Sequence, residues 1–238
     1  MSNSPATSFE IEKSSQDKHQ REVRDMFDVV APRYDLMNDI MSMGIHRLWK
    51  HKCVSLLAPQ HGETVVDLAG GTGDLAQAFS KRGAKAIVCD PCVPMMACSK
   101  HTKSPINWVA GYGETLPFKD QSIDVLSIAF GLRNTSNPKE TLKEIQRVLK
   151  PGGRFLCLEF STAAFWLKPM YDAYSKHVIP QLGSMIAGEK EAYRYLVQSI
   201  REFPNQESLA SMMVDVGFKN VRYQNLSFGI AAIHTGNA

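Results

Sequence analysis

Short hydrophobic runs alternate with amphipathic stretches through the middle of the chain. The runs are rich in β-branched residues, which is typical of buried strands, whereas the stretches between them repeat their apolar residues at helical spacing. The expected strands cover residues 64–68, 85–89, 106–110, 123–130 and 154–160, and the expected helices cover residues 74–81, 94–100 and 138–149. Strands and helices that alternate in this way predict a parallel, doubly wound α/β sheet.

Both ends of the chain depart from this alternation. Residues 19–57 have a helical pattern, and the aromatic-rich residues 161–204 are interpreted as a helical insertion that lies over the sheet. A last helix, 206–216, precedes two strands near 219–226 and 229–235, which are close enough in sequence to pair antiparallel. The expected fold is therefore a seven-stranded, mostly parallel sheet that ends in a C-terminal antiparallel hairpin.

The composition is that of an ordinary globular protein. With 238 residues, of which 44% are hydrophobic and 21% charged, the chain fits one domain with additional elements. We expect residues 1–18 to be a flexible tail and residues 19–238 to form a single domain. The formal net charge of +3 is too small to indicate a nucleic-acid partner.

The sequence contains no signal for secretion or for a membrane span. No apolar run approaches the roughly 18 residues that a span needs, and residues 1–20 lack the apolar stretch of a signal peptide. The odd number of cysteines, five, favours reduced thiols and a cytoplasmic location. Cys89, Cys92, Cys98 and His101 have a spacing that resembles a zinc site, but Cys89 falls in a strand expected to be buried. We therefore expect no metal site.

A glycine-rich loop follows the first expected strand and leads into a helix. The loop, residues 67–73, reads Asp-Leu-Ala-Gly-Gly-Thr-Gly, and glycines there let a ligand approach the backbone closely. Asp90 ends the second strand, where an acid accepts hydrogen bonds from ribose hydroxyls. The pattern indicates a cofactor that contains a nucleoside, although a glycine turn without a ligand remains an alternative.

Charge favours one nucleoside cofactor over another. The loop also satisfies a loose dinucleotide fingerprint, so an NAD-dependent oxidoreductase is a competing interpretation. Asp67 and Asp74, however, flank the loop and would repel a pyrophosphate. S-adenosylmethionine carries a sulfonium and an ammonium instead, which acids attract. Together with the terminal hairpin, this favours an S-adenosylmethionine-dependent methyltransferase.

Two long segments, residues 34–50 and 147–161, carry a more specific resemblance. They read YDLMNDIMSMGIHRLWK and RVLKPGGRFLCLEFS, and shorter matches lie at residues 116–118, 130–134, 171–175 and 193–196 and at His177. In these segments the chain resembles the ubiquinone/menaquinone biosynthesis C-methyltransferases, which are class I methyltransferases that use S-adenosylmethionine. The resemblance runs from about residue 20 to the C-terminus.

This resemblance implies a reaction and a substrate. The family methylates a ring carbon of a prenylated quinol, so the expected reaction is the conversion of demethylmenaquinol to menaquinol. C-methylation of a 2-polyprenyl-6-methoxy-1,4-benzoquinol in ubiquinone biosynthesis, alone or as a second activity, is the alternative. Because the substrate is a membrane lipid, peripheral contact with the inner membrane is a further hypothesis. The aromatic insertion is expected either to line the quinol side as a lid or to be core.

The resemblance also carries over cofactor-contacting positions, with two departures. Thr72 and Asp90 match the family, but Tyr112-Gly113 stands where the family often has Asn or Asp followed by Ala, and Ala129 stands where it often has Ser. A non-catalytic cofactor-binding module is the alternative that these departures leave open. The complete set of expected cofactor-binding residues is Asp67, Gly71, Thr72, Gly73, Asp90, Tyr112, Gly113 and Ala129.

The expected catalytic residues are Arg133, Asn134, Tyr34 and His177. Arg133 and Asn134 follow the fourth strand at the ligand-binding edge, where Arg133 could stabilise a phenolate by its charge. Its own pKa is too high for a general base, so a water would carry the proton. Tyr34 could instead be a core residue, and His177 could be structural. His46 and Arg47 are expected to act as scaffold or to contact the cofactor carboxylate.

Overall fold

The computed structural model describes residues 18, 20–21, 23–29, 31, 39, 42, 44–99, 104–167, 169 and 190–238, and for residues 190–193 it describes the backbone alone. Residues 1–17, including most of the predicted tail, lie outside the described residues, as do Tyr34, His101 and His177.

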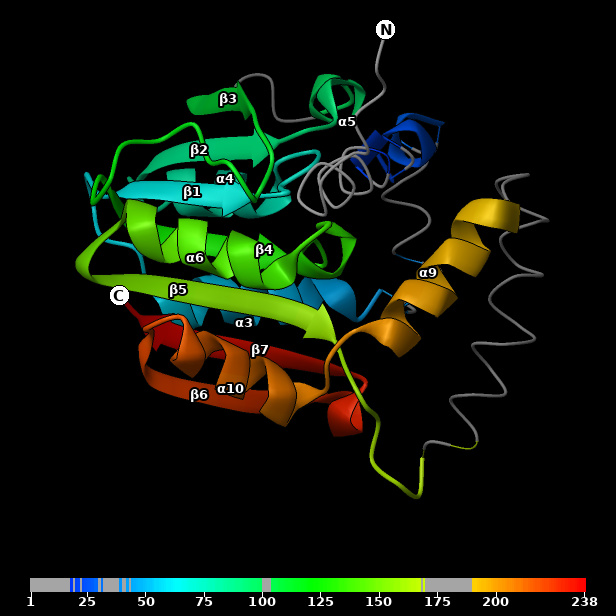
Figure 1. Ribbon diagram of the computed structural model, residues 1–238. Helices are drawn as coiled ribbons and strands as arrows, with labels where there is room; N and C mark the ends of the chain where they lie inside the picture. The colour runs from blue at the N-terminus through cyan, green and yellow to red at the C-terminus, as the bar shows by residue number, and fades with distance from the viewer. Residues whose placement is uncertain are drawn as a thin grey trace, which may run out of the picture.

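A seven-stranded sheet organises the chain in the order β3-β2-β1-β4-β5-β7-β6. Strands β1 to β5 pair in parallel, and β7 pairs antiparallel with both β5 and β6. The strands are β1 Thr64–Leu68, β2 Lys85–Asp90, β3 Ile106–Ala110, β4 Ile123–Ala129, β5 Leu149–Phe160, β6 Lys219–Leu226 and β7 Ala231–Asn237. The predicted mostly parallel sheet with a C-terminal antiparallel pair is confirmed (Figure 1).

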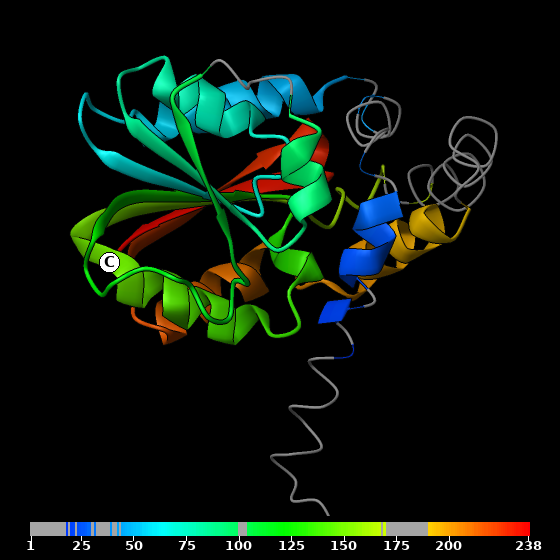
Figure 2. The same cartoon turned by 90° about the horizontal axis from the view of Figure 1, so that it is seen from above.

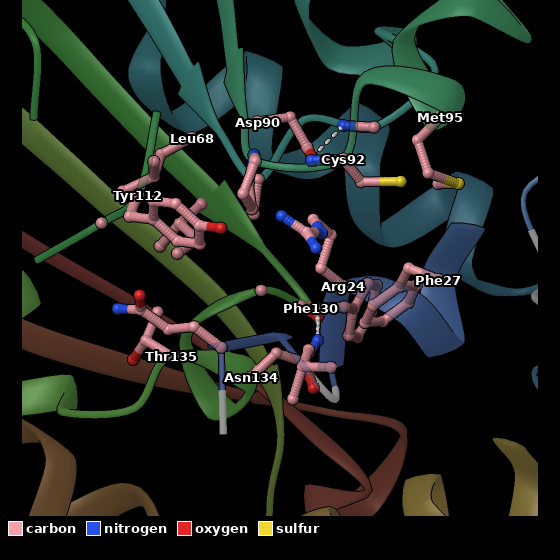
Figure 3. Close-up of a pocket in the computed structure, with 18 of the residues that line it drawn as sticks. Arg24, Phe27, Leu68, Asp90, Cys92, Met95, Tyr112, Phe130, Asn134 and Thr135 are labelled. Carbon is pink, nitrogen blue, oxygen red and sulfur yellow. Dashed lines mark hydrogen bonds between the residues drawn. The ribbon is translucent and has the colours of Figure 1, made fainter. Parts of the chain in front are cut away.

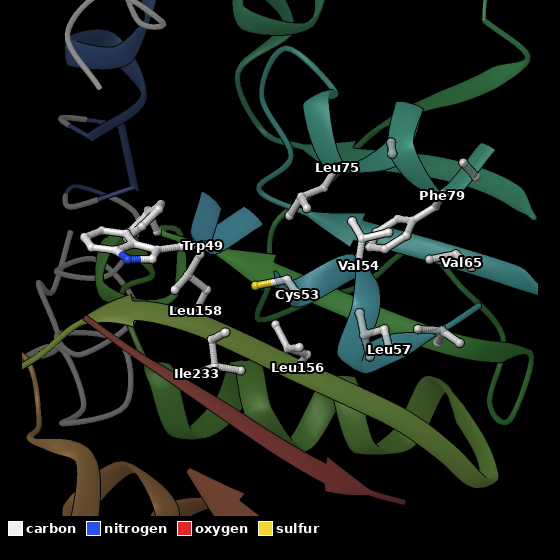
Figure 4. Packing of buried hydrophobic residues seen from close by; sticks show 14 of the residues in the cluster. Trp49, Cys53, Val54, Leu57, Val65, Leu75, Phe79, Leu156, Leu158 and Ile233 are labelled. Atoms are coloured by element: carbon white, nitrogen blue, oxygen red, sulfur yellow. The ribbon is translucent and has the colours of Figure 1, made fainter. Parts of the chain in front are cut away.

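Helices cover both faces of this sheet, as Figures 1 and 2 show. Figure 4 shows the core on one face, where α3 (His46–Leu57) and α4 (Asp74–Ser80) bury Trp49, Val54 and Phe79. On the other face, α6 (Pro138–Val148) and α10 (Gln206–Asp215) cover a second core that contains Leu142, Ile145 and Met213. Parallel sheets need both faces covered, so the strands are apolar on both sides.

Several boundaries differ from the sequence-based prediction by a few residues, and two of the differences have a clear reason in the backbone. Strand β5 begins at Leu149 because Leu149 already pairs with Ile123 of β4, so α6 ends at Val148. Strand β7 begins at Ala231 rather than near residue 229, because Ser227, Phe228 and Gly229 have positive φ angles and form the 3-10 turn η4. An extended strand needs negative φ, so these three residues cannot continue it.

The predicted insertion, residues 161–204, is described only in part. Residues 161–164 are irregular, and α9 (Lys190–Glu202) is helical as expected. Near the other end of the chain, residues 23–29 form a helical segment, and a short helix α5 (Val93–Ala97) follows β2. The carboxyl ends of β1 and β4 meet between these two segments. At this point the order of the strands reverses, and open α/β sheets bind ligands there.

Candidate functional site

A pocket lies at this reversal of strand order (Figure 3). The loops after β1, β2 and β4 supply most of its wall, and the helical segment 23–29 closes one side. Residues that line it include Arg24, Phe27, Leu68, Ala69, Gly71, Asp90, Cys92, Met95, Tyr112, Gly113, Phe130, Gly131, Asn134 and Thr135. The wall combines apolar side chains with a few polar groups, which is the usual character of a small-molecule site.

The glycine loop approaches the pocket because its backbone takes conformations that side chains disfavour. Gly71 has a φ of +54°, and a Cβ on it would lie 3.0 Å from the Met95 methyl group, which lines the pocket. A Cβ on Gly131 would lie 2.4 Å from the Cβ of Ala69. Glycine therefore lets the loop after β1 approach α5 at Gly71 and the loop after β4 at Gly131.

Asp90 is buried at the end of β2, with 6% of its surface exposed. Its two carboxylate oxygens accept hydrogen bonds from the backbone N–H groups of Gly71 and Cys92, each at 2.8 Å. Burial raises the pKa of Asp90 to about 6, although these two bonds lower it in part. A carboxylate oxygen can accept more than one bond, so Asp90 retains acceptors for the hydroxyls of a ribose.

Asp67 lies beneath the glycine loop. It is 2% exposed, and Oδ1 accepts a hydrogen bond from the hydroxyl of Ser127 at 2.8 Å. A Cβ on Gly70 would lie 2.8 Å from Asp67 Oδ2, so the carboxylate touches the loop from below. Burial raises the pKa of Asp67 to about 7. This position suits a residue that shapes the loop and adds negative potential to the pocket.

The remaining expected cofactor residues divide between the pocket and its surroundings. Tyr112 and Gly113 line the pocket, with the Tyr112 ring beside Leu68 (Figure 3). Thr72 lines a separate cleft between α3 and α4. Gly73 packs on Trp108, since a Cβ there would lie 2.7 Å from its ring, and Ala129 packs against the α3 side of the core.

Among the residues that the structure adds to the pocket are Arg24 and Phe27 of the helical segment 23–29, which the sequence pattern did not assign to it. Figure 3 shows the Arg24 guanidinium reaching between Tyr112 and Phe27. The helical spacing of residues 23–27 indicated an amphipathic helix, but periodicity cannot tell whether the apolar face covers a core or a ligand site.

Arg133 forms a buried ion pair behind the pocket. Its Nη1 donates to Glu159 Oε1 at 3.2 Å and Oε2 at 3.0 Å, and the side chains of the pair are 6% and 1% exposed. The guanidinium also lies over the Phe160 ring and donates to the carbonyl of Phe130. Burial raises the pKa of Glu159, while Arg133 acts in the opposite direction. Glu159 is a residue that sequence reasoning missed, although an acid within a hydrophobic strand was a signal.

Asn134, next to Arg133, lies at the pocket wall itself. Its Nδ2 donates to the Phe130 carbonyl at 3.2 Å, and its Oδ1 accepts from the Tyr195 hydroxyl at 3.4 Å. An amide nitrogen has two N–H groups, so Asn134 has a further donor for a ligand oxygen. The two expected catalytic residues of this loop therefore differ: Asn134 faces the pocket, whereas Arg133 supports it.

His46 and Arg47 lie at the start of α3 and share one acid. Arg47 donates to both carboxylate oxygens of Asp39 at 2.9 and 2.6 Å, and His46 Nε2 lies 3.2 Å from Asp39. These contacts support the scaffold interpretation. In the described part of the chain no three His, Cys, Asp or Glu side chains gather as they would around a metal ion.

Comparisons with known proteins agree with this geometry. Residues 14–238 match the model of the ubiE/COQ5 methyltransferase family. A ubiquinone/menaquinone biosynthesis C-methyltransferase UbiE from Rubrivivax gelatinosus is 50% identical, covering 96% of this chain and 92% of its own. A mitochondrial 2-methoxy-6-polyprenyl-1,4-benzoquinol methylase from Dictyostelium discoideum is 40% identical, covering 97% and 85%. The crystal structure of an S-adenosylmethionine-dependent methyltransferase from Thermotoga maritima, a possible histamine N-methyltransferase, superposes with a TM-score of 0.67 at 19% identity, covering 90% and 99%.

Proposed function

Since the chain belongs to the ubiE/COQ5 methyltransferase family, whose members are S-adenosylmethionine-dependent C-methyltransferases of quinone biosynthesis, we propose that its substrate is demethylmenaquinol. The observation that carries this proposal is the pocket wall, where the Asn134 amide stands among apolar side chains such as Phe27 and Phe130. A prenylated naphthoquinol offers one hydroxyl to such an amide and two fused apolar rings to such a wall.

S-adenosylmethionine supplies the methyl group, which is bound to a positively charged sulfur. The described residues fit this cofactor: Asp90 offers acceptors for ribose hydroxyls, Gly71 leaves its backbone accessible, and Tyr112 presents a ring to the pocket. Asp67 and Asp90 are buried and form no salt bridge within the described residues, although the charge of Lys50 lowers the pKa of Asp67 in part. We propose that the cofactor's positive groups provide that missing charge.

On the quinol side, the chain has to favour ionisation of a hydroxyl next to the carbon that is methylated. We propose that the second N–H of Asn134 donates to that oxygen and holds the ring in line with the methyl group. Arg133 lies behind Asn134, and its ion pair with Glu159 holds the loop that carries this amide. Because an Arg guanidinium does not give up its proton near neutral pH, water carries the proton away. Tyr34 and His177 stay proposed as substrate contacts or base.

A benzoquinol substrate is the second candidate, and the relative from Dictyostelium discoideum favours it. The two substrates share the prenyl chain and the hydroxyl that Asn134 would contact. They differ in the second fused ring, so the extent of the apolar wall decides between them.

Methyl transfer measured on paired demethyl naphthoquinol and demethyl benzoquinol substrates tests the proposal. We expect a higher kcat/KM for the naphthoquinol, and an Asn134→Ala variant to lose about 10- to 100-fold in kcat. Lys143→Ala, a change at an exposed ion pair on α6, is the matched control and should keep full activity. Transfer to the benzoquinol alone, or to neither substrate, would contradict the proposed substrate.

The prenylated substrate also bears on location. No helix within the described residues is long and apolar enough to cross a bilayer. We propose that the protein works from the cytoplasm and reaches its lipid substrate at the membrane surface.

A further inference from the structure

Three aromatic side chains stand exposed together at the carboxyl edge of the sheet. Phe165 is 87% exposed, Trp166 57% and Phe228 67%. The Trp166 and Phe228 rings contact each other edge to face, with their centroids 5.1 Å apart. We call Phe165, Trp166 and Phe228 the aromatic patch. A core role for Phe165 and Trp166, one of the two interpretations of the insertion, does not fit these exposures.

Backbone hydrogen bonds hold this patch in place. The two loops that carry it, residues 161–167 and 227–230, lie side by side after β5 and before β7 (Figure 1). Ser161 N donates to Ile230 O at 2.9 Å, and Ala164 N donates to Phe228 O at 2.8 Å. The Gln206 side chain adds a bond to Thr162 O at 3.0 Å. The aromatic rings therefore project from a defined platform.

Phe228 is held outward in an unfavourable backbone conformation. Its φ is +59°, a region that bulky residues rarely adopt, and Gly229 follows with a φ of +90° and packs against the carbonyl of Thr162. Strain of this kind, in a side chain that gains nothing from burial, persists where the exposed group has a use.

A buried aromatic contact links the wall of the pocket to the start of the loop that carries Phe165 and Trp166. Phe130 lines the pocket and packs on Phe160, with ring centroids 4.8 Å apart, and Phe160 directly precedes the loop 161–167. Phe160 pairs with Ala231, so both loops lie at the same edge of the sheet as the carboxyl end of β4. A surface held against the patch therefore lies at the same edge of the sheet as the pocket.

The area and charge of the patch select its occupant. An aromatic side chain has roughly 150–250 Å² of surface, so the three exposed fractions amount to about 400 Å². A stable protein interface buries about 800 Å² on each partner. The two loops contain no charged residue of either sign, so the patch is apolar and does not repel a lipid surface. A few protruding Trp and Phe side chains are the usual means of inserting into the interface of a bilayer.

We propose that the aromatic patch inserts into the surface of a lipid bilayer and holds the pocket against it. This rests on the proposed function, because a prenylated quinol is dissolved in the bilayer and would enter the pocket from there.

Sedimentation with vesicles of phosphatidylcholine and phosphatidylglycerol tests docking without any quinol. We expect the wild-type protein to pellet with the vesicles and the triple variant Phe165→Ser, Trp166→Ser, Phe228→Asn to bind about tenfold more weakly or less. Asn tolerates positive φ, so this variant relieves backbone strain and should fold. The control is Leu56→Ser, Val214→Ser, which removes two exposed apolar side chains at the helix ends that lead into β1 and β6.

Fluorescence locates the contact. Lipids with brominated acyl chains should quench Trp166 strongly, and the Trp166→Phe variant should lose most of this quenching, because Trp49 is buried and Trp108 is partly buried. Equal pelleting of the wild-type and triple variants, absence of pelleting, or pelleting without quenching of Trp166 would overturn the proposal. So would a dimer in sedimentation equilibrium that the triple variant abolishes, since a second copy would then be the occupant.

Methyl transfer separates this proposal from the proposed function. The triple variant should methylate a short-chain quinol dispersed in detergent at the wild-type rate and lose about tenfold or more on a long-chain quinol in vesicles. One outcome is that the wild type binds vesicles, the triple variant loses this binding, and the wild type methylates neither substrate. That result would contradict the proposed function and still support the docking surface.

Discussion

The site as proposed has a cofactor half and a quinol half, and the two bury their acids in different ways. In the cofactor half, Asp67 and Asp90 are 2% and 6% exposed, and neither has an ion-pair partner among the described residues. In the quinol half, Glu159 is 1% exposed and contacts Arg133 through both of its oxygens. Carboxylates without a cation favour a positively charged ligand, whereas the Arg133–Glu159 pair is already neutral. We therefore expect the cofactor half to need a positively charged ligand for charge balance, whereas the quinol half balances its own buried charge.

Removing one member of the Arg133–Glu159 pair should have the largest effect. Glu159→Ala leaves a guanidinium buried without its counter-charge, and we expect it to lower the free energy of unfolding by about 3–5 kcal/mol. Urea unfolding measures this change. The double variant Arg133→Met, Glu159→Leu removes both charges and should recover most of the loss. If the single variant were as stable as the wild type, the ion pair would not hold the loop after β4.

Replacing Asp90 should have the next largest effect, and it should fall on the ligand. Asp90→Asn keeps the size of the side chain and removes the charge that would receive ribose hydroxyls and the cofactor's positive groups. We expect S-adenosylmethionine to bind about 10- to 100-fold more weakly, in keeping with hydrogen bonds to a charged group. Calorimetric titration measures the affinity. Asp124→Asn is the control, since Asp124 pairs with Lys150 and does not line the pocket. An unchanged affinity would contradict the comparison between the two halves.

The pH dependence of both stability and binding should follow from the raised pKa values. The pKa values of Asp67 and Asp90 rise from an ordinary 3.8 to about 7 and about 6 in the folded protein. The folded state therefore holds protons on these two acids that the unfolded state has lost, so their contribution to the stability of the unliganded protein should fall as pH rises from about 4 to 7. Burial lowers the pKa of His46 and His234, which act in the opposite direction as pH rises toward 6.5, so the effect of Asp90 is measured as the difference between the wild type and Asp90→Asn. A positively charged ligand favours the ionised acids, so its affinity should rise over the upper part of this range.

Thermal unfolding and calorimetry at several pH values check these opposite trends. Asp90→Asn should remove the part of each trend that has a midpoint near pH 6. An affinity for S-adenosylmethionine that falls between pH 5 and 7 would contradict the claim that ionised Asp67 and Asp90 favour the positively charged ligand.

The fold could be predicted from the sequence because the patterns that indicate its strands and helices are local. The alternating runs located the strands, and Asn137 with Pro138 marked the start of α6, where the Asn137 side chain accepts bonds from the backbone of Lys139 and Glu140. Each signal depends on neighbours within a few residues. The start of β7 was not predicted correctly, because nothing local indicates positive φ at Phe228.

The site could be predicted from the sequence in part, since Gly71, Asp90, Tyr112, Gly113 and Asn134 were expected there and line the pocket. Arg133 and Glu159 are 26 residues apart, so their ion pair depends on the register between β4 and β5. Arg24 reaches the pocket from a helix whose sequence shows only that it is amphipathic. Long-range pairings of this kind follow from the packed structure and not from any local pattern.

Breaking an exposed ion pair outside both halves should change the free energy of unfolding least. It tests whether burial explains the large effect expected for the Arg133–Glu159 pair. Arg47 contacts Asp39 through two hydrogen bonds, as closely as Arg133 contacts Glu159, but the Arg47 side chain is 69% exposed and that of Asp39 is 32% exposed. Water already solvates both groups, so Arg47→Ala should change the free energy of unfolding by about 1 kcal/mol or less. Urea unfolding in low and in high salt measures this, and salt should weaken only this pair. A loss as large as that of Glu159→Ala would mean that burial is not what distinguishes the two pairs.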